Sequence, residues 1–92
     1  MSDVLVPQAV NSRSQAAQLV AGLPDDLSSA EVIVDVSSTE LMTPSFVDEL
    51  VRQCLQVRNA RAMRLKDADE MFIDMALESA RLRDVATRLF VE

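Results

Sequence analysis

The side chains best suited to chemistry gather in one short stretch of the chain, residues 38–49. Its hydroxyl groups could accept a phosphate, and two neighbouring carboxylates, Asp48 and Glu49, have the composition of an acid–base pair. Adjacent helical residues do not face one another, however, and no base or metal ligand accompanies this pair. We therefore expect Asp48 and Glu49 to be surface acids that complement a helix dipole or face a partner. The candidate partner-binding residues are Arg13, Ser38, Thr39, Glu40, Thr43, Pro44, Ser45, Asp48 and Glu49.

The amino-acid composition argues against most kinds of enzyme active site. Histidine is absent, and the chain holds one cysteine and one glycine. The commonest general base and metal ligand is therefore missing, and no zinc site, Cys–His nucleophile or glycine-rich phosphate loop can be assembled. The acids Asp67, Asp69, Glu70 and Asp74 do not have the spacing of a calcium loop, so a solvated acidic face is expected there. We therefore expect a protein that is not an enzyme and that needs no metal or cofactor.

The charge balance narrows the range of partners. A net charge of −6 at pH 7 argues against nucleic acid and anionic membrane surfaces, both of which require a basic face. No run of about 18 apolar residues is present that could insert in a membrane, and the first residues lack the pattern of a signal peptide. Because a lone cysteine forms no internal disulfide, we expect a cytoplasmic protein. The expected partner is another protein, and the sequence leaves the oligomeric state undetermined.

The polar stretch must be positioned by a strand before it and by a helix that begins inside it. Residues 32–36 form a β-branched apolar run with one acid, which is typical of a strand covered on both faces. Thr43 can cap the helix, Pro44 fits its first position, and Ser45 lies in its exposed first turn. Such a strand-to-helix junction is where parallel sheets usually carry their functional residues.

The helix that follows is predicted to run from residue 44 to about residue 57 and to bury one broad face. Helical spacing links Phe46 to Leu50, so we expect Phe46 to be a core anchor; an exposed Phe46 would instead be a hot spot for a partner. Cys54 lies on the same stripe and is expected to be an inert core thiol. Asn59 can close the helix.

The remaining elements complete an alternating pattern. A strand is expected at residues 3–6, another at 62–66, and a third helix capped by Asp67 or Asp69. Residues 85–91 are predicted as a last strand, with a continuing helix as the alternative. The order β-α-β-α-β-α-β predicts an α/β fold, with a mainly parallel four-stranded sheet and three helices in a single domain over residues 1–92. With three short helices, we expect one sheet face to be less well covered than the other.

Two groups of side chains outside the polar stretch allow two interpretations each. Ser12 and Gln15 have the spacing of a capping box, which places Arg13 in the first turn of the first helix. Arg13 there would bind a phosphate or an acidic side chain, or remain solvated. The methionines Met63, Met71 and Met75 would form an adaptable binding surface or, as their spacing favours, fill the core.

The central stretch and the order of elements together resemble a STAS domain, and more narrowly the small bacterial STAS-like family. That family has a strand, a short polar loop, and Ser-Phe-x-x-Glu-Leu at the start of a helix. The pattern stands here as Val34-Asp35-Val36 followed by Ser45-Phe46-Val47-Asp48-Glu49-Leu50. The early Ser-Arg of the family is matched by Ser12-Arg13. The resemblance covers residues 4–91.

The resemblance implies a non-enzymatic regulatory module. STAS antagonists bind histidine-kinase-like ATPases that act as anti-sigma factors, and phosphorylation of a serine at the start of the helix breaks the complex. Where antagonists carry Asp-Ser-Ser-Gly, this chain has Thr43-Pro44-Ser45-Phe46, so proline occupies the position of the phosphorylated serine. Ser45, and after it Thr43, are the candidate phosphoacceptors. The alternative from another class is a structural or adaptor STAS subunit of a larger complex, such as a lipid transporter.

Overall fold

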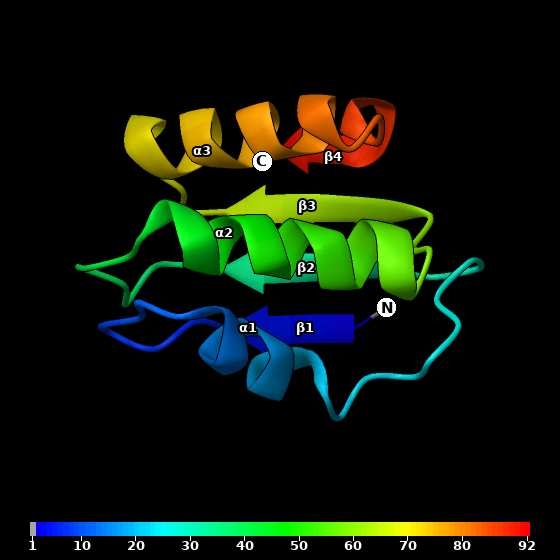
Figure 1. Ribbon diagram of the computed structural model, residues 1–92, viewed down its shortest axis with the longest axis horizontal. Helices are drawn as coiled ribbons and strands as arrows, with labels where there is room; N and C mark the ends of the chain where they lie inside the picture. The colour runs from blue at the N-terminus through cyan, green and yellow to red at the C-terminus, as the bar shows by residue number, and fades with distance from the viewer. Residues whose placement is uncertain (1) are drawn as a thin grey trace.

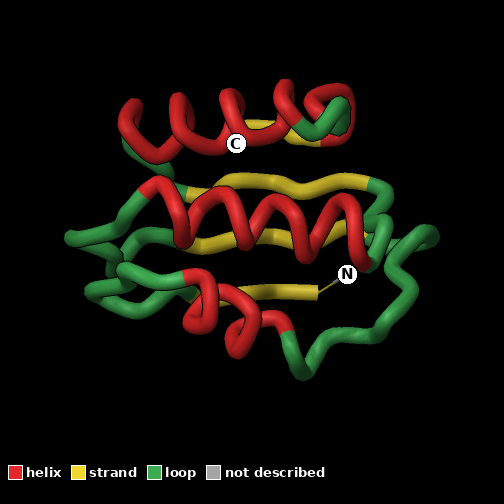
Figure 2. Tube along the Cα trace, viewed as in Figure 1, coloured by secondary structure: helices red, strands yellow, loops and turns green. Residues whose placement is uncertain are grey.

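The computed structural model describes residues 2–92, in which four strands alternate with three α-helices (Figures 1 and 2). The strands are β1 (Ser2–Leu5), β2 (Glu31–Asp35), β3 (Ala62–Lys66) and β4 (Leu89–Val91). The α-helices are α1 (Arg13–Val20), α2 (Pro44–Val51) and α3 (Glu70–Leu82). All strands run parallel in the order β1-β2-β3-β4, so the predicted α/β class, four-stranded sheet and number of helices are confirmed.

Short-range signals in the sequence set the start of each helix. Ser12 caps α1, and its exchange of hydrogen bonds with Gln15 forms the predicted capping box. Thr43 caps α2, and Pro44 occupies the first position, where a missing N–H costs nothing. Of the two candidate aspartates, Asp69 caps α3. The predicted helix starts are therefore confirmed.

The second helix changes its winding halfway along. After α2, residues Arg52–Val57 continue as a π-helix, η1, so that the helical segment spans the predicted residues 44–57. The segment is closed by Asn59, whose φ of 55° lies in the left-handed region that asparagine tolerates. At the other end of the chain, a 3₁₀ turn, η2 (Ala86–Arg88), precedes the short β4. Residues 85–91 are therefore strand only from Leu89 onward, and the continuing helix is wrong.

All three helices lie on one face of the sheet (Figure 1). When parallel strands follow chain order, every right-handed crossover places its helix on the same side, and α2 accordingly packs between α1 and α3. Along β2, Val32 and Val34 are buried under the helices, whereas Glu31, Ile33 and Asp35 on the other face are only half-buried. The expectation that this strand is covered on both faces is wrong, and the expectation of one less covered face is confirmed.

The core lies between the sheet and the helix layer. Its two largest fully buried side chains are Phe46 and Phe72, so Phe46 is the core anchor that its spacing predicts. Cys54 and Met63 are also fully buried. Met71 is 68% exposed on the outer side of α3, so the prediction that it fills the core is wrong. Within residues 2–92, no helix combines the length and the apolar character needed to cross a membrane.

Candidate functional site at the start of α2

The loop before α2 is tied to the loop after β1. The hydroxyl of Thr39 donates to the carbonyl oxygen of Val6 at 3.1 Å, and the Glu40 carboxylate accepts from the Gln8 amide at 2.6 Å. Of the predicted site residues in this loop, Thr39 and Glu40 therefore hold the loop in place, while Ser38 is exposed. These contacts fix the path by which the chain enters α2.

The first turn of α2 presents Ser45 to solvent. The Thr43 hydroxyl accepts from the backbone N–H of Phe46 at 3.4 Å, and the buried Phe46 ring fixes the helix on the sheet. Because residues one or two positions apart point in different directions from a helix, burial of Phe46 leaves Pro44 and Ser45 exposed. The predicted placement of Thr43, Pro44 and Ser45 is confirmed.

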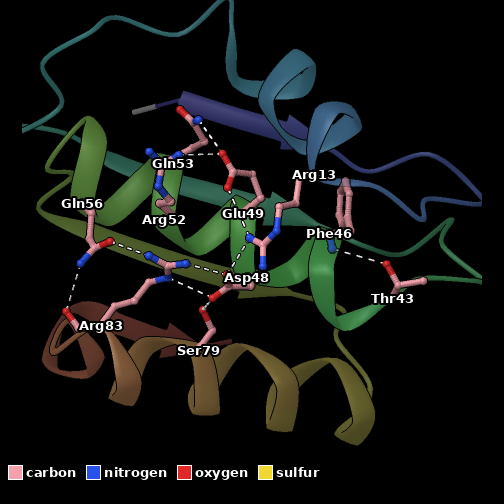
Figure 3. A network of polar contacts seen from close by, with 10 residues as sticks. All are labelled: Arg13, Thr43, Phe46, Asp48, Glu49, Arg52, Gln53, Gln56, Ser79 and Arg83. Carbon is pink, nitrogen blue, oxygen red and sulfur yellow. Dashed lines mark hydrogen bonds and ion pairs between the residues drawn. The ribbon is translucent and has the colours of Figure 1, made fainter.

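Asp48, one turn further along α2, is the centre of a polar network that joins the three helices (Figure 3). Its carboxylate accepts from Arg83 at 2.6 Å (Nη2) and 2.9 Å (Nε), from the Ser79 hydroxyl at 2.7 Å, and from Nη1 of Arg13 at 2.7 Å. The Asp48 side chain is 24% exposed. The Arg83 hydrogen bonds, helped by Ser79 and Arg13, outweigh burial and hold the pKa of this carboxyl well below its usual range.

Glu49 belongs to the same network and not to the surface. Its carboxylate accepts from Arg52 and Gln53, both at 2.8 Å, and from Arg13 at 3.4 Å. Burial alone would raise the pKa of Glu49, but the Gln53 hydrogen bond and the Arg52 charge lower it overall. Because Glu49 is only 8% exposed, the expectation that both acids lie on the surface is wrong. Contacts from η1 and from α1 cover it.

Arg13 links α1 to both acids of α2 (Figure 3). Of the alternatives left open by the sequence, the acidic side chain is the one that Arg13 binds, and the guanidinium side chain is still 53% exposed. The sequence patterns did not reveal the partners on α3, Ser79 and Arg83. Their register with Asp48 depends on the packing of α3 against α2, for which a single sequence carries no local signal.

A hollow of about 330 Å³ opens beside this network, between the start of α2 and the middle of α3. Arg13, Ser45 and Asp48 form its polar side, and Pro44, Met75 and Leu82 form its apolar side. A second hollow, of about 260 Å³, adjoins it because Met75 lines both, and Thr39 and Glu40 border this second hollow. The structure thus brings seven of the nine predicted site residues to two adjoining hollows or to the loop that supports them. Ser38 is exposed away from both hollows, and Glu49 is buried next to Asp48.

The remaining chemistry of the site is sparse. Burial raises the pKa of the Cys54 thiol to about 12, which removes the thiolate that a nucleophile or metal ligand would need. Across the described residues, 2–92, no three His, Cys, Asp or Glu side chains are grouped as a metal site requires. What the site offers is an exposed hydroxyl, a half-exposed guanidinium and an apolar wall, which suit binding.

Comparison with known proteins adds no family or function: no protein-family model, no curated protein and no solved structure matches this chain significantly.

Proposed function

We propose that the protein is a non-enzymatic, regulatory binding module whose partner docks over the start of α2, and that phosphorylation of Ser45 controls this docking. The observation that carries the proposal is the position of Ser45. It is exposed in the first turn of α2 and lines the same hollow as Arg13. The resemblance to the STAS-like family supports a histidine-kinase-like ATPase or anti-sigma factor as the partner.

The surroundings of Ser45 favour a phosphate in two ways. At a helix N-terminus, the phosphate charge of about −1.5 to −2 meets the positive end of the helix dipole. Arg13 lines the same hollow as Ser45, and its side chain is 53% exposed. Asp48, an opposing charge in the same hollow, is already paired with Arg83 at 2.6 Å, which weakens its repulsion of a phosphate.

The same geometry supplies a mechanism for the switch. A phosphate on Ser45 competes with Asp48 for Arg13, while Arg83 and Ser79 continue to hold Asp48. Arg13 would then turn from Asp48 toward the phosphate and change both the charge and the shape of the docking surface. The partner that recognises the unmodified surface is thereby released.

The test is affinity capture from the source cells with wild type, Ser45→Asp and the matched control Ser45→Ala, read by mass spectrometry. Capture of a kinase-like ATPase by wild type and Ser45→Ala, with loss in Ser45→Asp, supports the proposal. Incubation of the captured ATPase with ATP should add one phosphate to wild type at Ser45 and none to Ser45→Ala. Equal capture of the ATPase by all three proteins would keep the binding module and reject the switch at Ser45. Recovery of transporter or scaffold subunits would instead support the structural or adaptor alternative.

A further inference from the structure

Helix α3 carries a second stripe of side chains on its outer side, separate from the stripe that packs on the sheet. The stripe consists of Met71, Met75, Glu78 and Leu82, of which Met75 is half-buried and also packs against the core. These residues are four, three and four positions apart, which is the a/d spacing of the heptad pattern by which two helices pack side by side. Residues with this spacing are called the seam of α3. Met71 is 68% exposed and Leu82 is 81% exposed, so both apolar ends of this stripe face mostly solvent.

The stripe forms one wall of two neighbouring hollows, together called the groove. The two hollows beside α3 both reach Met75, and the opposite wall is built from Leu41, Pro44 and Ser45. The eleven steps from Met71 to Leu82 rise about 16 Å along the helix, so the wall extends over three helical turns. The length and the regular seam fit another helix, because an amphipathic helix buries one apolar face in such a groove. Methionine side chains on the wall adapt to the shape of an incoming face.

The acidic side chains around the groove indicate the charge of the helix that would bind there. Glu40 and Asp69 border the second hollow and Glu78 borders the first, and among residues 2–92 no cation pairs with Glu78. The cation at the groove, Arg13, is already bound to Asp48 and Glu49. Pairing with a second copy through α3 would bring two acidic helices together in a chain of net charge −6. The groove therefore complements a basic partner and opposes self-association.

The uncovered face of the sheet offers a contrast. There, Glu31 pairs with Arg61 and Arg64, and Arg64 also lies over the Phe90 ring at 4.9 Å from the ring centroid. The charge of Glu31 is thus compensated by two arginines, as is common on a surface exposed to water. The exposed stripe of α3 has no such compensation.

We propose that the groove between α3 and the start of α2 binds a basic amphipathic helix of the partner, with apolar side chains on Met71, Met75 and Leu82 and a lysine or arginine opposite Glu78. This inference rests on the proposed function, because Ser45 lies on the wall of the same groove. It names what the partner presents: about three turns of helix with a positive charge near the middle. A phosphate on Ser45 would change the wall against which that helix packs.

The test uses the full chain labelled with ¹⁵N and a synthetic helical peptide with leucine at the a and d positions of two heptads and lysine on its other positions. Control peptides carry the same residues in scrambled order, or glutamate in place of lysine. We expect amide shifts confined to residues 39–45 and 71–82 with the heptad peptide. Met71→Ala, Leu82→Ala and Glu78→Lys should each weaken binding about tenfold, as interface anchors do. Val57→Ala, an equally conservative change at another exposed apolar residue, should leave affinity unchanged.

Four results would overturn the inference. Shifts spread over the open sheet face, or equal affinity for the scrambled peptide, would show that the acidic surface attracts the peptide without a groove. Unchanged affinity for the peptide in all three α3 variants would show that the stripe of α3 is not the binding surface. Sedimentation equilibrium that shows a wild-type dimer dissociated by Leu82→Ala would assign the stripe to a second copy. A positive peptide result together with failed capture of an ATPase would retain the groove and reject the proposed function, whereas the reverse would reject only the groove.

Discussion

The substitution Asp48→Asn should destabilise the protein by about 3 kcal/mol. Asparagine has nearly the same shape but no charge, and its NH₂ group faces donors. The largest loss is the pair of charge-assisted hydrogen bonds from Arg83, which contribute about 1.5 kcal/mol each at the lower end of the usual range. We take the lower end because the Asp48 side chain is 24% exposed. The bond to Arg13, which is 53% exposed, adds less than about 1 kcal/mol, and the remaining oxygen of asparagine offsets part of it.

Urea unfolding followed by far-UV circular dichroism measures this change, since the chain has no tryptophan or tyrosine to serve as a fluorescent probe. With a urea m-value of about 1 kcal/mol per molar for a small domain, the midpoint should fall by roughly 3 M. The melting temperature should fall by about 12 to 24 °C. Such a loss is a large part of the roughly 5–15 kcal/mol that stabilises a typical domain.

Glu49→Gln is the matched control, with the same chemical change at the neighbouring acid. Glutamine still accepts from Gln53, and the lost charge pair involves the more exposed Arg52, so we expect about 1 kcal/mol. A double-mutant cycle of Asp48→Asn with Arg83→Met should give a coupling energy of at least about 1.5 kcal/mol. A loss for Asp48→Asn no larger than for Glu49→Gln, or a coupling energy near zero, would refute the assignment of Asp48 as the link between α2 and α3.

Three further results are expected. The pKa values of Asp48 and Glu49 are lowered in the folded state. Their contribution to stability is therefore full above about pH 5 and is lost as the pH falls below the ordinary carboxyl pKa of about 4. Urea midpoints measured at pH 7, 5, 4 and 3 should fall less steeply in Asp48→Asn than in wild type. Native Cys54, with a thiol pKa raised to about 12, should react with a thiol reagent at pH 8 only at the rate of unfolding, and rapid labelling without urea would contradict its burial. Thr43→Ala should cost about 1 kcal/mol through loss of the α2 cap, whereas Ser45→Ala should change stability by less than about 0.5 kcal/mol; equal effects would show that the cap is unimportant.

The sequence was sufficient wherever a structure depends on residues close together in the chain. The capping box of Ser12 and Gln15, the Thr43-Pro44 start of α2 and the left-handed Asn59 each need only a few neighbouring residues. The burial of Phe46 also follows from local spacing. Because these signals repeat in the order strand, helix, strand, they were enough to predict the parallel sheet.

Features that depend on distant residues were missed. Glu49 looked like a surface acid because Arg13, which helps to cover it, lies on another helix. Met71 had core-like spacing, but α3 has two apolar stripes and only one can face the sheet. The apolar run through Ile33 suggested a strand covered on both faces, since a single strand does not reveal on which side the crossovers lie. Tertiary packing decides all three.

The strand order has a consequence for how the protein is made. Each strand pairs with the strand that precedes it: Val4 lies beside Val34, and Val34 beside Leu65, with about thirty residues between partners. During synthesis, every strand and helix that leaves the ribosome therefore finds its neighbour already present, and no early segment must wait for a later one to be inserted beside it. The growing edge of the sheet moves with translation until β4, three residues long, ends it.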